Sequence, residues 1–196
     1  MTRALDVLIA GAALVITSPL LVAAVIAIRL ESRGHPIYRQ RRVGKDGEPF
    51  ELLKLRTMVA GAEHIGDGLA VNVGDPRITR VGALLRRFSL DELPNLVNVL
   101  RGDMSIVGPR PTIQAQVDQY TPRQRRRLEV KPGITGWAQV NGRASLPWHE
   151  RIELDVWYVD NRSLLLDLRI LARTARMLAT GHGLYKGETG GWKPTA

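Results

Sequence analysis

Cysteine is absent from this 196-residue chain, which excludes disulfides, thiol nucleophiles and zinc–thiolate sites. Histidine is scarce, and the four that occur have no metal-ligand spacing. Any catalytic metal should therefore be a hard, oxygen-bound ion such as Mg²⁺ with few protein ligands. Acidic residues are outnumbered by Lys and Arg, 19 against 28, and the net charge of +9 indicates an acidic partner: nucleic acid, anionic lipid head groups or a phosphorylated small molecule.

Glycine motifs that grip nucleotides are missing as well. No G-x-x-x-x-G-K-[ST] occurs, and no G-x-G-x-x-G opens a helix after a strand. The chain has no internal repeat, and its length suits one ordinary domain with a real core.

One long hydrophobic segment occupies residues 5–28, with Asp6 as its single charge and arginines at both ends. About 20 apolar residues can span a bilayer, so this segment belongs to a membrane. Pro19 in its middle removes a helix hydrogen bond, and the Ser18 hydroxyl can satisfy the freed carbonyl, so a sharp bend is expected. Each half, ~18 Å long, is too short to cross a core of about 30 Å. These lengths favour a re-entrant helix–break–helix, and a kinked transmembrane span is the alternative.

Two short strands are expected at residues 37–43 and 50–56, joined by a glycine-containing turn into a β-hairpin. Lys54 and Arg56 alternate with leucines, so one face of the second strand is cationic. These two side chains either bind phosphate or form an ordinary solvated face.

The most charged stretch is residues 86–111, with the adjacent carboxylates of Asp91 and Glu92 at its centre. Ser89 followed three residues later by Glu92 has the form of a capping box, which predicts a helix start at Ser89 to Asp91. A helix start favours ionised carboxylates and attracts anions. The flanking arginines are Arg86, Arg87, Arg101 and Arg110. This arrangement suits a metal-bridged phosphate, and the alternative is a capped helix with surface ion pairs.

Further helices are expected at residues 77–88, 113–120, from Thr121 onward, 149–160 and 163–180. Thr121 followed by Pro122 has the usual cap-then-proline pattern of a helix start, and the last helix should be capped by Ser163 and closed by Gly181. The helix from Thr121 carries four arginines that either lie on anionic head groups or form a solubilising face: Arg123, Arg125, Arg126 and Arg127. In the last helix a stripe of leucines opposes arginines, so this helix either lies in a membrane interface or packs on the domain. The sequence therefore predicts an α+β fold that is mostly α.

Two loops are also expected. Residues 63–75 are rich in glycine and polar side chains and should lie at the surface. Residues 131–143 are a second glycine-rich loop, in which Trp137 and the amide of Gln139 can contact a base or a sugar, or simply pack.

These motifs, taken in order, resemble the bacterial sugar transferases that act as monotopic polyprenyl-phosphate phosphoglycosyl transferases. The resemblance covers nearly the whole chain, and so many motifs in one order are highly specific. The motifs are Ser18-Pro19, Arg39-Gln40-Arg41, KLRTM at 54–58, SLDELPNLVNVLRGDMSIVGPRP at 89–111, KPGITGWAQVNGR at 131–143, and the region of Asp155, Tyr158 and Asp167. Asn95 and Leu55 depart from the commoner glutamine and phenylalanine, and neither belongs to the acidic pair.

The resemblance implies a two-step exchange. The Asp91 carboxylate attacks the β-phosphate of a UDP-sugar and releases UMP, and polyprenyl (undecaprenyl) phosphate then takes the phosphosugar from the aspartate. Asp91 is implied as nucleophile and Mg²⁺ ligand, and Glu92 as acid/base or metal-site partner. The implied substrate and phosphate contacts are Arg86 as stabiliser of the acidic pair, Arg110 as phosphate ligand, and Lys54, Arg56 and Gln139 as further binding residues.

The resemblance also implies an organisation: residues 1–30 as a re-entrant membrane hairpin, residues 31–182 as a cytoplasmic catalytic domain with interfacial amphipathic helices, and residues 183–196 as a loosely ordered tail. The site would lie at the cytoplasmic face of the bacterial inner membrane, in contact with membrane lipids and not with nucleic acid. Family members can form homodimers, although this sequence does not indicate one. The implied role is the first membrane step of a glycoconjugate or exopolysaccharide pathway.

Without the resemblance, the residues are also compatible with two other functions. A membrane-tethered basic binding protein would explain the charge but not the acidic pair within the most basic region. A lipid-diphosphate phosphatase could use an aspartyl-phosphate without any nucleotide. No motif distinguishes galactose, glucose or N-acetylated donors.

Overall fold

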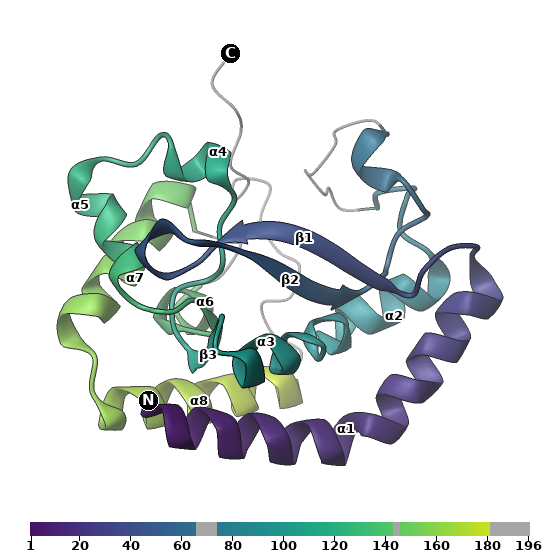
Figure 1. Cartoon of the computed structure of the whole chain (residues 1–196), viewed down its shortest axis with the longest axis horizontal. Helices are drawn as coiled ribbons and strands as arrows, with labels where there is room; N and C mark the ends of the chain where they lie inside the picture. The colour runs from purple at the N-terminus through teal and green to yellow at the C-terminus, as the bar shows by residue number, and fades with distance from the viewer. Residues whose placement is uncertain (66–73, 143–145, 181–196) are drawn as a thin grey trace.

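The computed structural model describes residues 1–65, 74–142 and 146–180. A long helix is followed by a β-hairpin, a series of short helices and strands, and two longer helices (Figure 1). The predicted α+β fold, mostly α, is confirmed. The expected tail at 183–196 lies outside the described residues, as does most of the 63–75 loop.

Helix α1 (Arg3–Glu31) contains Pro19 and is one continuous helix that bends near its middle (Figure 1). The Ser18 hydroxyl donates to the carbonyl of Val15 at 2.8 Å, which is the carbonyl that Pro19 leaves without its usual donor. The expected bend and its serine partner are confirmed. The helix continues through the bend without an interruption, because this side-chain hydrogen bond replaces the missing backbone one. The re-entrant insertion of this segment stays a prediction.

Strands β1 (Ile37–Val43) and β2 (Pro49–Leu55) form the predicted antiparallel hairpin, joined through a 3₁₀ turn, η1 (Lys45–Gly47). Leu52, Leu53 and Leu55 are buried, and the first two belong to opposite faces of the strand. Strand β2 therefore packs against other parts of the protein on both faces, instead of having one face exposed to solvent. A further 3₁₀ turn, η2 (Ala62–His64), follows it.

Helix α2 (Arg80–Arg87) is capped by Thr79, and the 3₁₀ turn η3 (Leu90–Glu92) links it to α3 (Asn95–Arg101). The predicted capping box is wrong. Ser89 has φ 54° and makes no side-chain cap hydrogen bond, and its N–H instead closes the preceding turn on the carbonyl of Arg86. The Asp91–Glu92 pair therefore lies on a 3₁₀ turn ahead of the helix.

Strands β3 (Ser105–Val107) and β4 (Gly133–Thr135) form a parallel pair, and α6 (Trp137–Val140) follows the second. The sequence predicted only a loop here, because three-residue strands beside proline and glycine carry no periodic signal. Glycine is required by close approach: a Cβ on Gly133 would lie 2.1 Å from the backbone nitrogen of Gly108.

The remaining helices are α4 (Gln114–Val117), α5 (Pro122–Arg125), the 3₁₀ turn η4 (Arg126–Glu129), α7 (Trp148–Asn161) and α8 (Leu164–Thr180). The cap-then-proline start of α5 is confirmed, with a capping box between Thr121 and Gln124. The Ser163 hydroxyl accepts from the N–H of Leu166 at 3.2 Å and so caps α8 as predicted. The expected C-terminal glycine of α8, Gly181, lies outside the described residues.

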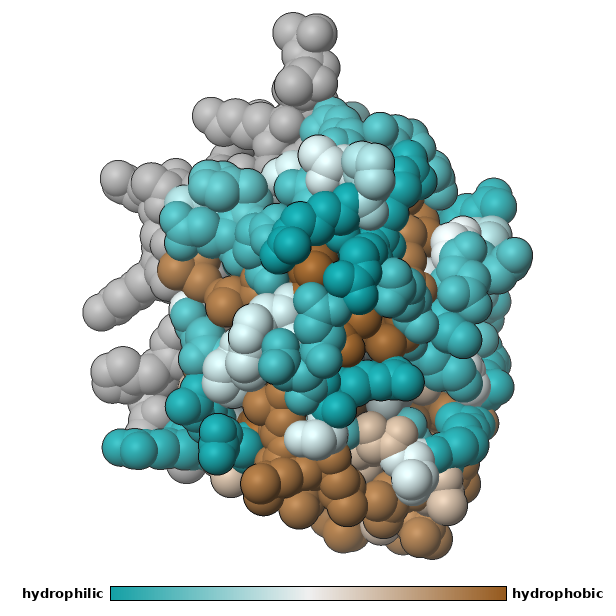
Figure 2. Space-filling model, turned by 90° about the vertical axis from the view of Figure 1, so that its left-hand side faces the viewer, coloured by the Kyte–Doolittle hydropathy of each residue, from teal (hydrophilic) through white to brown (hydrophobic). Residues whose placement is uncertain are grey.

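The largest core cluster joins the two ends of the chain: Ala10 of α1, Leu52 of β2, Val99 of α3, Met104, and Ile170 of α8. The opposite side of α8 is exposed, and three leucines of the predicted stripe lie there: Leu164, Leu168 and Leu178. Exposed apolar side chains of α1 include Leu8, Val15, Ile16 and Leu30. Figure 2 shows the apolar residues gathered at the lower end of the molecule, where α1 and α8 lie in Figure 1. We call these exposed side chains of α1 and α8 the apolar base.

Candidate active site

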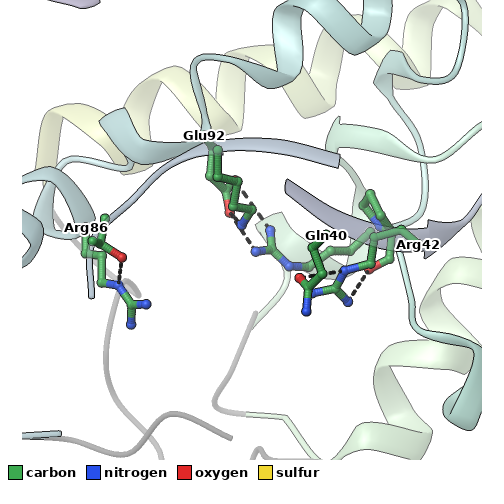
Figure 3. A network of polar contacts seen from close by, with 8 residues as sticks. Gln40, Arg42, Arg86 and Glu92 are labelled. Atoms are coloured by element: carbon green, nitrogen blue, oxygen red, sulfur yellow. Dashed lines mark hydrogen bonds and ion pairs between the residues drawn. The ribbon is translucent and has the colours of Figure 1, made fainter. Parts of the chain in front are cut away.

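The 3₁₀ turn η3 holds the acidic pair beside β2. The Oε1 atom of Glu92 accepts from Lys54 Nζ at 2.9 Å and from Arg110 Nη2 at 2.6 Å (Figure 3). Lys54 comes from β2, whereas Arg110 comes from the Gly-Pro-Arg-Pro turn after β3. The tertiary fold thus brings together three of the predicted site residues from distant parts of the chain.

The charge state of Glu92 is set by these partners. Burial by itself would raise its pKa, but the charges and hydrogen bonds of Arg110 and Lys54 hold the pKa of Glu92 well below its usual range. Burial lowers the pKa of Lys54, and the carboxylate of Glu92 opposes that shift. Glu92 is therefore an ionised carboxylate whose charge is already compensated.

Asp91 differs from its neighbour. Among the described residues its carboxylate makes no hydrogen bond or ion pair, so both oxygens are available. Burial and the charge of Glu92 raise the pKa of Asp91, and nearby cations oppose this rise. An uncommitted carboxylate beside compensating positive charge can attack an electrophilic phosphorus or bind a metal ion.

Arg86 lies at the end of α2 and apart from Glu92 in Figure 3. Its Nε donates to the Thr57 hydroxyl at 2.7 Å. The positive charge of Arg86 still acts on Asp91, whose pKa it lowers. Arg86 therefore acts on Asp91 by its charge, while the hydrogen bond from its Nε is to Thr57 and not to the acidic pair.

Two of the predicted binding residues do not join this group. The guanidinium of Arg56 is committed to the end of α1, because it donates to the carbonyls of Arg33 and Ser32 at 2.8 Å each. Gln139 is buried in α6, and neither its Oε1 nor its Nε2 has a hydrogen-bond partner among the described residues. Their roles toward a substrate stay predictions.

Sequence reasoning missed Arg42 as a site residue. Its side chain lines a small pocket together with Lys54, Glu92, Asn95 and Arg110. Burial, followed by the positive charge of Arg110, lowers the pKa of Arg42 to about 10. A signal was present, because Arg42 and Lys54 lie on neighbouring strands and Gln40 and Arg42 alternate with the exposed Arg39 and Arg41.

The backbone of Arg110 is held by a buried ion pair between Arg127 and Asp155. Arg127 donates from Nη2 to the carbonyl oxygen of Arg110 at 2.9 Å and to Asp155 Oδ2 at 2.5 Å. Both Arg127 and Asp155 are buried. The prediction that Arg127 lies on head groups or on a solvated face is therefore wrong, because Asp155 of α7 offers it a buried counter-ion. Arg123 and Arg125 of the same cluster are exposed.

The donor set for a metal ion is small. In the part of the chain that the structure describes, no three His, Cys, Asp or Glu side chains converge. Among the described residues Asp91 has both oxygens free, whereas Glu92 accepts from Lys54 and Arg110 at Oε1 and from Arg110 at Oε2, the latter at a long 3.5 Å. Such a site fits Mg²⁺ held by one carboxylate plus phosphate oxygens and waters better than an all-protein cage. Glu92 as a second ligand stays a prediction.

Comparison with known proteins places the chain in a family. The family model for bacterial sugar transferases matches residues 1–181. An uncharacterized sugar transferase, EpsL of Bacillus subtilis, is 46% identical over 87% of this chain and 83% of that protein. The UDP-glucose:undecaprenyl-phosphate glucose-1-phosphate transferase of Caulobacter vibrioides is 45% identical over 93% of this chain and 71% of that protein.

A third relative is longer. The UDP-N-acetylgalactosamine-undecaprenyl-phosphate N-acetylgalactosaminephosphotransferase of Aeromonas hydrophila is 43% identical over 92% of this chain, which corresponds to 44% of that protein. The match of the family model over nearly the whole length and the identity to these relatives lead to one conclusion. The chain belongs to the bacterial sugar transferase family.

Proposed function

We propose that this chain transfers a sugar-1-phosphate from a UDP-sugar to polyprenyl (undecaprenyl) phosphate, giving polyprenyl-diphospho-sugar and UMP. The observation that carries the proposal is the contrast between the two carboxylates. Glu92 is neutralised by Lys54 and Arg110, whereas Asp91 has no hydrogen bond or ion pair among the described residues. The names of the Caulobacter and Aeromonas relatives, both sugar-phosphate transferases acting on undecaprenyl phosphate, support the substrate classes.

The proposed chemistry has two displacements at one phosphorus atom. An Asp91 oxygen bonds to the β-phosphorus of the UDP-sugar, and the bond from that phosphorus to the bridging oxygen breaks, so UMP leaves with the electron pair. An oxygen of polyprenyl phosphate then bonds to the same phosphorus, and the Asp91 carboxylate leaves. One anhydride replaces another, so no further energy source is required.

The cations around the acidic pair have separate roles in this proposal. Lys54 and Arg110 hold Glu92 and offer positive charge to the diphosphate, and Arg110 can grip phosphate with its fork of N–H groups. The positive charge of Arg86 also acts on Asp91 and favours its ionised form. Mg²⁺, when bound by Asp91 and phosphate oxygens, would supply further neutralisation of the diphosphate.

We also propose that α1 enters and leaves the membrane on one face, with the apolar base in the lipid and the site at the cytoplasmic interface. The two ends of α1 bind the same body. Arg3 donates to the carbonyl of Leu100 at 2.7 Å, and Glu31 accepts from the N–H of Arg80 at 2.7 Å. A straight span would separate these ends by a core of about 30 Å. One-sided insertion of the bent α1 brings a lipid-bound acceptor to a water-soluble donor.

The experiment that tests the function measures UMP release by protein purified in nanodiscs, with Mg²⁺, polyprenyl phosphate and a panel of UDP-sugars. UMP formed from one donor, and lost in Asp91→Asn, supports the transferase and identifies its sugar. Asp118 is an exposed residue between α4 and α5, so Asp118→Asn is the matched control and should keep full activity. No UMP from any donor in folded protein would contradict the proposal and favour a binding protein. Release of inorganic phosphate without nucleotide would favour a phosphatase.

A further inference from the structure

Arg42 is a partly buried cation that has no anionic partner within the described parts of the chain. Its Nε and Nη2 atoms both donate to Gln40 Oε1, at 3.0 and 2.5 Å, and Nη1 donates to the carbonyl of Pro111 at a longer 3.4 Å (Figure 3). Both acceptors are neutral. Among the described residues no carboxylate lies within ion-pair distance of Arg42, in contrast to Lys54 and Arg110.

This arrangement is unfavourable without a ligand. A cation removed from water is stabilised only by an opposite charge or strong hydrogen bonds. Instead, burial and the like charge of Arg110 lower the pKa of Arg42, and the charge of Glu92 opposes this only in part. Both guanidinium groups line the same pocket beside Glu92, so an anion placed between them would relieve the repulsion.

The position of Arg42 indicates which anion it can reach. Arg42 lines one pocket with Lys54, Glu92 and Arg110, and Asp91 is not among the residues that line this pocket. The Nη1 atom of Arg42 also donates to the carbonyl of Pro111, the residue after Arg110. An anion in this pocket would therefore lie beside Arg110 rather than at the nucleophile itself, which suits the phosphate next to the attacked phosphorus.

We propose that Arg42 binds the α-phosphate of the UDP-sugar, the phosphate that leaves as UMP, and that Gln40 is the positioning residue that aims the Arg42 guanidinium. The inference rests on the proposed transferase function and assigns the leaving-group side of that site. When the bridging bond breaks, the electron pair goes to the bridging oxygen, which stays on UMP. Arg42 and Arg110 stabilise the charge that develops there, and Arg42 transfers no proton.

The test compares Arg42→Gln with Arg41→Gln, a matched control that removes the same charge from the adjacent, exposed position of β1. We expect Arg42→Gln to lower kcat/KM for the UDP-sugar and to weaken inhibition by UMP, each by about tenfold or more, because a charge-assisted contact is lost. The KM for polyprenyl phosphate should stay within about twofold of wild type. Arg41→Gln should behave as wild type in all three measurements.

A second pair of variants tests whether Gln40 orients the guanidinium of Arg42. Gln40→Leu removes the acceptor and should weaken UMP inhibition severalfold, whereas Arg42→Lys keeps the charge without the fork and should recover only part of the loss. Thermal unfolding in nanodiscs identifies any variant that fails to fold. If Arg42→Gln does not fold, the comparison of Arg42→Lys with wild type decides by the same measurements.

The outcomes separate this inference from the proposed function. Wild-type UMP release with unchanged UMP inhibition in Arg42→Gln would overturn the role of Arg42 and leave the transferase intact. A raised KM for polyprenyl phosphate with unchanged UMP inhibition would place Arg42 on the acceptor and would also overturn it. If wild type released no UMP, direct binding of UMP by calorimetry would still decide, since equal affinity of wild type and Arg42→Gln contradicts the inference.

Discussion

Glu31, the last residue of α1, accepts a hydrogen bond of 2.7 Å from the backbone N–H of Arg80, the first residue of α2. Its other oxygen accepts from the N–H of Val81 at 3.0 Å. The end of the hydrophobic helix therefore caps the helix that leads to the acidic pair, because the first N–H groups of a helix have no partner within it. Anchoring of α1 and positioning of the site are thus structurally connected.

Replacement of Glu31 by alanine should weaken this connection. We expect a loss of about 1 kcal/mol in the free energy of unfolding, the usual effect of removing a helix cap. Thermal unfolding in nanodiscs measures the change, and Glu48→Ala in the exposed hairpin turn is the control. Equal melting temperatures for Glu31→Ala and Glu48→Ala would show that the cap does not contribute to stability.

The one-sided insertion of α1 can be tested by labelling, because the chain has no native cysteine to interfere. Single cysteines at Thr2 and Arg33, exposed positions just outside the two ends of α1, should both be protected from a membrane-impermeant reagent added outside the inner membrane. Both should react once the membrane is opened. Labelling of Thr2→Cys in intact cells, with Arg33→Cys protected, would mean that α1 spans the membrane.

The rate of UMP release should have an acidic limb set by Asp91, which attacks as a carboxylate. Burial and Glu92 raise the pKa of Asp91, so the rate should fall at a higher pH than the ordinary aspartate value of 3.8 would give. Glu92→Gln removes the like charge, so the acidic limb should move to lower pH while the overall rate drops. Single-turnover rates against pH measure this, with the exposed Glu153→Gln as control. A limb that moved to higher pH in Glu92→Gln would contradict the assignment.

The buried pair of Arg127 and Asp155 should matter for stability and for Arg110. Asp155→Leu leaves the Arg127 charge buried without its partner and should cost about 3 to 5 kcal/mol. Adding Arg127→Met should recover most of that loss, because two apolar groups then replace the pair. The double variant should still have a raised KM for the UDP-sugar, since the Arg110 carbonyl has lost its donor. A normal KM in the stable double variant would show that Arg127 has no positioning role.

Gln139 offers a test of a predicted substrate contact. Its amide is buried and has no hydrogen-bond partner among the described residues, which costs free energy in the unliganded protein. Gln139→Met should therefore leave the melting temperature unchanged or raise it. If Gln139 binds the donor, the same variant should lower kcat/KM for the UDP-sugar about tenfold or more. A drop in melting temperature with unchanged kinetics would indicate a packing residue instead.

Local signals in the sequence predicted most of the elements. The hairpin, the cap of α5, the serine cap of α8 and the bend near Pro19 all depend on residues within a few positions of one another. The short parallel pair β3–β4 was missed because its pairing joins Ser105 with Gly133, far apart in the chain. The capping box at Ser89 failed because the end of α2 fixes that residue at φ 54°.

By itself, the sequence determined the family, the long hydrophobic N-terminal segment and the acidic pair, because each is encoded in contiguous residues in a recognisable order. Only the tertiary structure decided which cations meet that pair. Lys54 and Arg110 reach Glu92, Arg56 turns to the end of α1, and Arg42 enters the pocket. The physical reason is that the sequence specifies which residues are charged, whereas the packing of strands and turns that are distant in the chain determines which charged side chains come into contact.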